Sequence, residues 1–360
     1  PKTIKIFGQG GRMLPMLNNS DYPQDLKENA IKFVGEEDGT FNSNDYILFY
    51  AIWPKGYQEV SNTNINPYTD KSYYFVNVSS GLGKRIQSNI QPEGEASHVI
   101  DKYQDYIFLE EDEYNIAQEG RRWFGDRLYF ENEKTFSFEI PNIDTSQPIK
   151  LKVYAAAAAE TQTSMLLTVN GNLIDTFTFQ EINDPVLADD DSFVGDINVS
   201  SSNINVNLNY NNNGSPSSIG YLDFISIEAI RGLTYSGGQF QFQNKDVAFL
   251  SGIGQYNISN SSAISEVWDI TDQYNITSLQ NTNNSSAFSF KTQLGEERTY
   301  QAVDPSDYFE PKKDSNTRVD NQNIKGTVFL NNQGEFQDLD YLIISNEEML
   351  SQAERMAEIN

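Results

Sequence analysis

Residues 204–210 read Ile204-Asn-Val-Asn-Leu-Asn-Tyr210 and alternate apolar and polar side chains without a break. Such alternation places every second side chain on one face, as in a half-buried β-strand. The same pattern recurs in residues 136–140, 151–155 and 221–229. Because no helical pattern lies between these segments, the region predicts an antiparallel β-sandwich, of jelly-roll type.

Two shorter signals support the sandwich. Asn170-Gly171 lies between the apolar runs 165–169 and 173–179, and both residues tolerate the positive φ that a tight hairpin turn requires. The alanine run 155–159 would by itself favour a helix. Since it continues an alternating strand, we interpret it as a strand whose small side chains lie where two sheets approach closely.

Short β segments separated by turn residues also flank the sandwich, so the fold class predicted for the chain is all-β with several domains. The predicted strands are 3–7, 29–34, 46–52, 73–78 and 103–111 before it, and 239–243, 247–250, 266–270, 288–291, 299–303 and 324–330 after it. We predict an N-terminal β domain (1–118), the jelly-roll-like β-sandwich (119–232), a further β-sandwich domain or extension (233–335) and the start of another domain (336–360). Residues 305–323 have a linker composition.

The last segment has a different character. Tyr341 to Ile344 form an unbroken apolar run that fits a strand covered on both faces, and Ser345 with Glu348 fits a helix capping box. One face of the helix would carry Met349, Leu350, Ala353, Met356 and Ala357. A parallel strand needs a crossover helix and a second strand, so we expect the first β-α unit of an α/β domain whose remainder is absent from this sequence.

The composition excludes several classes of function. The chain has 25 basic and 51 acidic residues and a net charge of −26, which argues against nucleic acid and anionic lipid surfaces as partners. It has no cysteine, so disulfides, a thiolate nucleophile and zinc sites built on cysteine are excluded. His98 is the one histidine, and the sequence has no G-x-S-x-G motif that would supply a nucleophilic serine for it. We therefore interpret His98 as structural or surface-exposed.

No apolar run reaches the ~18 residues that a membrane-spanning helix requires, and the sequence contains no signal peptide. The chain begins with Pro1 in place of Met, which indicates a processed or engineered start that a signal peptide could have preceded.

Two glycine-flanked segments resemble ligand loops. Residues 8–12, Gly8-Gln-Gly-Gly-Arg12, lack the ending of a phosphate loop, and we interpret them as a turn. Residues 35–45 carry oxygen ligands without the spacing of a calcium loop, and we interpret them as an Asx-rich turn.

Two clusters remain as candidate sites. Asp189, Asp190 and Asp191 are expected on a loop, where they are either solvated or ligands of a structural Ca²⁺ ion. Arg121, Arg122 and Trp123 combine cationic and stacking groups that would suit a sugar ring or a carboxylate, or would pack at a domain junction. No residue is assigned a catalytic or cofactor-binding role, and no cofactor is required.

Several motifs, taken together and in chain order, resemble the pre-catalytic N-terminal region of the PorU family, the gingipain-like sortases (peptidase C25 class) of the type IX secretion system of Bacteroidetes. They are Lys5-Ile-Phe-Gly8 with Met13-Leu-Pro15, Gly35-Glu-Glu-Asp-Gly39 running into Asp45-Tyr-Ile-Leu-Phe-Tyr-Ala51, Arg122-Trp-Phe-Gly-Asp126, Val267-Trp-Asp-Ile-Thr271 and Asp340-Tyr-Leu-Ile-Ile344. The resemblance covers the whole chain, although each motif alone is weak. It implies that residues 336–360 open a caspase-like α/β peptidase domain.

The resemblance also implies a function for the parent protein, which would be an enzyme that removes the C-terminal signal of secreted cargo and joins the new end to an anionic lipopolysaccharide. The family's catalytic His and Cys match no position here. This segment would dock, present cargo or pack on its own peptidase domain at the outer-membrane surface. Its partners would be that domain, attachment-complex proteins such as PorV, and the cargo signal domains. The alternative is a glycan-binding or adhesive β-sandwich protein without an enzymatic domain.

Overall fold

The computed structural model describes most of the chain. The described residues are 1–17, 20, 22–23, 25–58, 61–118, 120–315, 318–319, 329–331, 333–338 and 341–359. They divide into two compact units, Pro1–Tyr308 and Phe309–Asn360. The division falls inside the stretch that the sequence predicts as a linker. The predicted domain boundaries inside residues 1–308 stay predictions.

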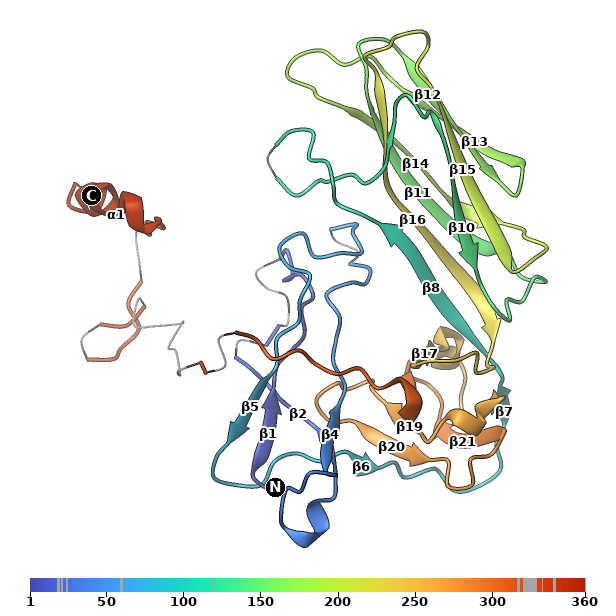
Figure 1. The fold of residues 1–360 in the computed structure, drawn as a ribbon, viewed down its shortest axis with the longest axis vertical. Helices are drawn as coiled ribbons and strands as arrows, with labels where there is room; N and C mark the ends of the chain where they lie inside the picture. Colours follow the sequence, from blue (N-terminus) through green and yellow to red (C-terminus); the bar gives the residue numbers. More distant parts are fainter. Residues whose placement is uncertain are drawn as a thin grey trace. The chain divides into compact units, whose positions relative to one another are not determined.

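The predicted β-sandwich is confirmed. One of its sheets has the strand order β10-β15-β12-β13, and the facing strands β14-β11-β16-β8 belong to a ten-stranded sheet (Figure 1). The bounds of these strands are β8 Lys102–Glu110, β10 Glu133–Glu139, β11 Ile149–Ala158, β12 Thr163–Val169, β13 Asn172–Phe179, β14 Asp189–Ile197, β15 Asn203–Asn211 and β16 Ile219–Gly232. The alternating residues Ile204, Val206 and Leu208 point into the core and are fully buried.

Both shorter signals within the sandwich are also confirmed. Asn170 and Gly171 have φ values of 48° and 79° and join β12 to β13. The alanine run extends β11, and Ala155 and Ala157 are fully buried in the core between the sheets. Small side chains allow the two sheets to approach each other at this point.

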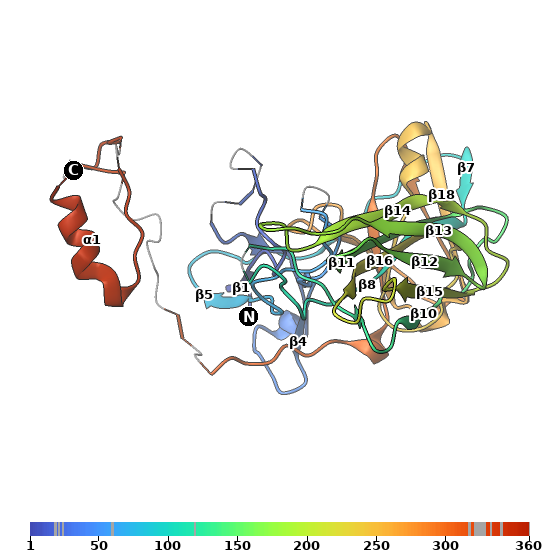
Figure 2. The same cartoon turned by 90° about the horizontal axis from the view of Figure 1, so that it is seen from above.

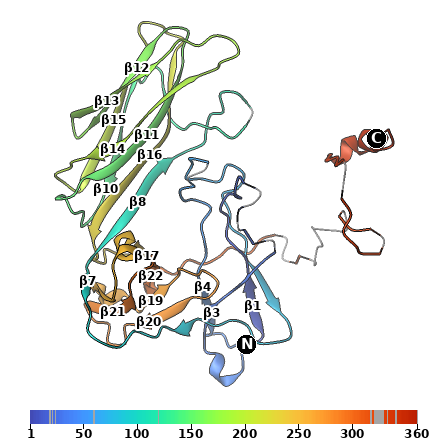
Figure 3. The same ribbon diagram turned by 180° about the vertical axis from the view of Figure 1, so that it is seen from behind.

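The ten-stranded sheet continues from the sandwich into a second layered region, because β8 pairs with β16 on one side and with β17 on the other (Figure 3). This second region buries an aromatic core in which the rings of Tyr256 and Phe290 stack with centroids 5.0 Å apart. Strand β7 runs parallel to β18 and forms one edge of the three-stranded sheet β21-β18-β7 (Figure 2). The bounds are β6 Gln87–Ser88, β7 His98–Ile100, β9 Arg127–Leu128, β17 Phe240–Gln243, β18 Ile253–Ser259, β19 Glu266–Asp269, β20 Thr277–Gln280, β21 Ala287–Gln293 and β22 Thr299–Val303.

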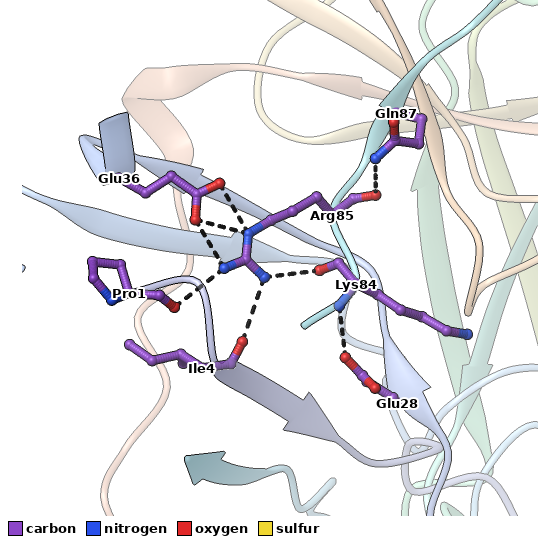
Figure 4. A network of polar contacts seen from close by, with 7 residues as sticks. All are labelled: Pro1, Ile4, Glu28, Glu36, Lys84, Arg85 and Gln87. Atoms are coloured by element: carbon purple, nitrogen blue, oxygen red, sulfur yellow. Dashed lines mark hydrogen bonds and ion pairs between the residues drawn. The ribbon is translucent and has the colours of Figure 1, made fainter. Parts of the chain in front are cut away.

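The N-terminal region consists of a three-stranded sheet, β2-β1-β5, and the pair β3-β4. Their bounds are β1 Ile4–Phe7, β2 Glu28–Asn29, β3 Ile31–Val34, β4 Tyr46–Phe49 and β5 Phe75–Val78. The guanidinium of Arg85 donates to Glu36, with an Nη2–Oε2 distance of 2.8 Å, and to the carbonyl oxygens of Pro1, Ile4 and Lys84 (Figure 4). One half-buried cation therefore ties the first residues of the chain to Glu36, in the segment 36–38, and to its own neighbour Lys84.

Several short 3₁₀ helices complete the fold. They are η1 Glu36–Asp38, η2 Lys245–Phe249, η3 Ser261–Ala263, η4 Pro305–Asp307 and η5 Glu347–Met349. The Asx-rich turn is confirmed: Asp38 and Asp45 accept hydrogen bonds from the backbone N–H groups of Thr40 and Asn42. The predicted strand 247–250 is wrong, because Asn244 caps a 3₁₀ helix there by accepting from the N–H of Asp246.

The C-terminal segment agrees with the prediction in part. The predicted helix is present as α1, Leu350–Ala357. Its start differs from the expected capping box, since Asn346 rather than Ser345 accepts a hydrogen bond from the N–H of Met349, at 3.0 Å. The predicted strand 341–344 is not formed, because no described strand of this unit lies beside it to complete its hydrogen bonds. Residues 324–328 and Asp340 lie outside the described residues.

No helix among the described residues is long and apolar enough to cross a membrane.

Candidate functional site

The arginine- and aromatic-rich turn, residues 121–126, lies beside strand β16. The N–H of Gly125 donates to the carbonyl oxygen of Leu222, and the N–H of Leu222 donates to that of Asp126. Phe124 is buried and its ring centroid lies 5.6 Å from that of Tyr221. The turn therefore leads into β9 beside β16, and Phe124 packs with Tyr221 and Ala156 in a cluster separate from the sandwich core.

A β-bulge in β16 aims a carboxylate at this turn. Tyr154 of β11 pairs with Phe224 and Ala155 pairs with Leu222, so Asp223 between them has no partner on β11. A bulge of this kind changes the direction of a side chain on a strand. The guanidinium of Arg122 lies 3.3 Å from Asp223 and 3.2 Å from Asp190. Arg122 thus forms ion pairs with two carboxylates of the same chain.

Three carboxylates gather around this position, and we call Glu110, Asp112 and Asp223 with Arg122 the acidic junction. Glu110 is buried and accepts hydrogen bonds from Thr63 Oγ1 and from the N–H and Nδ2 of Asn64, the last two at 2.6 and 2.7 Å. The junction therefore joins the sandwich to a loop of the N-terminal region.

Burial perturbs the titration of these groups. Desolvation raises the pKa of Asp223 to about 7, although the positive charge of Arg122 opposes the rise. Desolvation also raises the pKa of Asp112 to about 6, and the nearby charge of Glu110 adds to the rise. Asp112 and Asp223 thus take up protons closer to neutral pH than exposed aspartates do.

The other two candidate residues of the turn face different surroundings. Arg121 is exposed and its Nη1 lies 2.7 Å from Met16 Sδ, while Trp123 is half-buried. Leu14, Met16 and Leu17 are 63%, 43% and 59% exposed. We call these three residues the apolar patch. A hollow of about 310 Å³ opens beside it, lined by Met13, Pro15, Met16, Leu17, Ser20, Tyr22, Gln58 and Ser61. The structure therefore brings Arg121 to an exposed apolar surface.

The three aspartates, Asp189, Asp190 and Asp191, lie on β14, so their expected position on a loop is wrong. Asp189 and Asp191 accept hydrogen bonds from the N–H groups of Gln180 and Thr178, whereas Asp190 pairs with Arg122. Alternation along the strand directs Asp190 to the face opposite that of Asp189 and Asp191. Among the described residues, no group of three His, Cys, Asp or Glu side chains is placed to hold a metal ion. The Ca²⁺ site stays a prediction.

His98 is half-buried on β7, where its backbone pairs with Gly254 of β18. In the described part of the chain its ring forms no hydrogen bond with a carboxylate or a serine. The role of His98, structural or surface-exposed, stays a prediction.

A pocket of about 520 Å³ that the sequence does not indicate lies between the N-terminal region and the second layered region. We name it the Arg12 pocket, lined by Gln9, Arg12, Tyr22, Pro23, Lys27, Tyr50, Ile52, Gln241, Ile270, Gln273, Tyr274 and Thr299. One signal was present in the sequence, the turn Gly8-Gln-Gly-Gly-Arg12, which supplies two of these residues. The others come from segments up to 290 positions away, so no local pattern reveals them.

These observations define a class, a multi-sheet β protein with a β-sandwich and no cysteine nucleophile of its own. No protein-family model matches the chain, and no curated protein matches it. Among solved structures, the chain is similar to dimeric latent PorU from Porphyromonas gingivalis, with a TM-score of 0.64 and 19% identity. The match covers 85% of this chain and 29% of that one, so the chain spans under a third of that protein. The fold is therefore PorU-like.

The chain is also similar, at lower TM-scores, to two carbohydrate-binding modules. The module CBM36 in complex with calcium and xylotriose matches with a TM-score of 0.23 and 15% identity, over 34% of this chain and 98% of that one. A family 35 module from Clostridium thermocellum matches with a TM-score of 0.23 and 16% identity, over 35% of this chain and 95% of that one.

Proposed function

We propose that this chain is the non-catalytic N-terminal segment of a cell-surface sortase of the type IX secretion system. The observation that carries the proposal is the similarity in fold to PorU across most of the chain. The motifs that resemble the PorU family add to it, because they occur in the same order along the chain. The absence of cysteine from this sequence fits a segment whose enzyme chemistry resides elsewhere in the parent protein.

In this proposal the parent protein is a peptidase and transpeptidase that removes the C-terminal signal of cargo and joins the new end to an anionic lipopolysaccharide. The segment is displayed at the outer-membrane surface after export by a signal peptide. Its partners are its own peptidase domain, an attachment protein such as PorV, and cargo signal domains. Of these partners, the peptidase domain is the one that binds the apolar patch in this proposal.

The apolar patch supports this assignment through exposure and chemistry. Three large apolar side chains from one short segment, Leu14, Met16 and Leu17, face solvent beside a hollow that another side chain could fill. Arg121 stands next to them and can pair with a carboxylate at the rim of the contact. An apolar centre with a charged rim is the usual composition of a surface that binds another protein.

The test is association in trans between this chain and the separately produced peptidase domain of the parent protein. We expect saturable binding, measured by biolayer interferometry. The double variant Leu14→Ser, Leu17→Ser should weaken it at least tenfold because the centre of the contact is lost. Leu173→Ser is the matched control, since Leu173 is exposed to the same extent, 63%, on β13.

Binding that the double variant leaves unchanged would remove the apolar patch from the proposal. Binding to an attachment protein but not to the peptidase domain would reassign the patch to that partner. If the chain instead bound a glycan specifically, and Trp123→Ala abolished that binding, the adhesive β-sandwich would replace the sortase segment as the better account.

A further inference from the structure

The turn that opens the Arg12 pocket is held rigidly. Asn29 Nδ2 donates to the carbonyl oxygen of Gly8 at 2.8 Å, and Asn66 Nδ2 donates to that of Gly11 at 2.9 Å. Gly10 has a φ of +85°, and a Cβ there would lie 2.7 Å from the Cβ of Ile52. A pinned glycine turn presents its side chains in a fixed direction, which lowers the entropic cost of binding.

The pocket carries positive charge in an acidic protein. Arg12 and Lys27 both line it, in a chain with about twice as many acidic as basic residues. Within the described ranges neither of these side chains forms an ion pair. The guanidinium of Arg12 occupies the space over Gly56, because a Cβ on Gly56 would lie 1.5 Å from Arg12 Nη1. These two cations are available to an anionic group.

The remaining lining groups suit hydroxyl groups. Gln9, Gln241 and Gln273 offer amide donors and acceptors, and the hydroxyl of Tyr50 donates to Gln241 Oε1 at 3.1 Å. Two buried polar atoms of the pocket, Gln9 Oε1 and Tyr274 Oη, have no hydrogen-bond partner among the described residues. Buried polar atoms are nearly always hydrogen-bonded, so such atoms at a pocket indicate a missing polar partner.

We propose that the Arg12 pocket binds an acidic sugar of one or two residues, with its carboxylate or phosphate on Arg12 and its hydroxyls on the glutamine amides and Tyr274. The volume of about 520 Å³ is within the range of small-ligand sites and larger than a bare anion needs. The pocket lies between two regions of one compact unit, a common place for such sites. This inference does not depend on the proposed sortase function.

The experiment is a titration of the full chain, by calorimetry at low salt, with glucuronate, glucose 1-phosphate, glucose and inorganic phosphate. We expect saturable binding of the two acidic sugars, and binding of glucose and of phosphate at least tenfold weaker. Arg12→Gln should weaken acidic-sugar binding at least tenfold because the charged partner is lost. Tyr274→Phe, which keeps the ring, should weaken it several-fold.

Arg127→Gln is the charge-matched control, because Arg127 is exposed on β9 and does not line the pocket. It should leave acidic-sugar binding unchanged, and thermal melts of each variant should show that it folds. The proposal is overturned if neither acidic sugar binds, if glucose or phosphate binds as tightly as they do, or if folded Arg12→Gln binds them as tightly as the native chain.

Discussion

Asp223 shows how one residue couples charge to the packing of the sheet. It occupies the bulge of β16, is nearly buried, and has a raised pKa of about 7 in spite of its ion pair with Arg122. The cost of removing the carboxylate from water therefore exceeds the attraction of the half-exposed guanidinium. The folded protein binds a proton here more tightly than the unfolded chain does.

This raised pKa predicts the direction of a pH effect. Because the folded state holds the proton more tightly, Asp223 lowers the free energy of unfolding as pH rises from about 4 through about 7. Asp223→Asn mimics the neutral form of the side chain. The free energy of unfolding that this variant gains over the native chain should therefore be larger at pH 8 than at pH 5, by about 2 kcal/mol. Urea unfolding at both pH values measures this difference. An equal effect at both pH values would contradict the account.

Gly220 is a second residue whose role is set by its neighbours. A Cβ at this position of β16 would lie 2.9 Å from the ring of Tyr210 and 3.0 Å from the terminal methyl of Met165, both buried in the facing sheet. The missing side chain therefore lets the two sheets of the sandwich approach.

Gly220→Ala should destabilise the chain by about 1–3 kcal/mol, since the added methyl overpacks the core. Gly232→Ala is the matched control in the same strand, where a Cβ would have no neighbour closer than 3.8 Å. Thermal unfolding of both variants provides the comparison. Equal midpoints for the two would show that the sheets can move apart at no cost.

At the scale of elements, the pattern of side chains predicted the strands of the sandwich better than the strands around it. The alternation of apolar and polar side chains and the turn Asn170-Gly171 located β12, β13 and β15. One face of each of these strands packs in the core and the other faces solvent. Strand β14 was missed since it begins with three aspartates and shows no apolar alternation there. It exists because β11 supplies its hydrogen bonds, which is a tertiary effect.

The segment 341–344 shows the opposite error. Four consecutive apolar residues predicted a strand, yet Tyr341, Leu342 and Ile344 are exposed and irregular. Composition can favour a strand, but a strand also needs a neighbour to accept and donate hydrogen bonds. The local signal for α1 was sufficient, because a helix satisfies its own backbone groups.

The side chain of Arg85 ties the N-terminal sheet to η1. Its guanidinium and the carboxylate of Glu36 are only 17% and 23% exposed. Arg85→Met should destabilise this region by about 2 kcal/mol because several charge-assisted hydrogen bonds are lost.

Hydrogen exchange measures this effect directly. The amides of β1, β2 and β5 should exchange faster in Arg85→Met, while those of the sandwich strand β12 should not change. Lys71→Met, at an exposed position, is the control and should leave both regions unchanged. Uniform acceleration across both regions would mean that the ion pair stabilises the whole unit instead.

At the scale of the whole molecule, the side-chain pattern of the sequence predicted the class of fold. Its motifs resemble the PorU family, and the PorU-like fold is confirmed. The candidate sites were harder to predict. Arg122 and the three aspartates pair with groups of the same chain, and the Arg12 pocket assembles residues that only the folded sheets bring together. Such sites depend on contacts between segments that are far apart in the sequence. Local sequence patterns carry no information about those contacts.

The central claim is that this chain serves as the non-catalytic segment of a larger sortase. Peptide mass spectrometry of envelope fractions from the source organism tests it most directly, through peptides that are continuous with Asn360. We predict a polypeptide that continues for several hundred residues and contains a His and a Cys in an α/β pattern. A native protein that ends near Asn360 would contradict the claim.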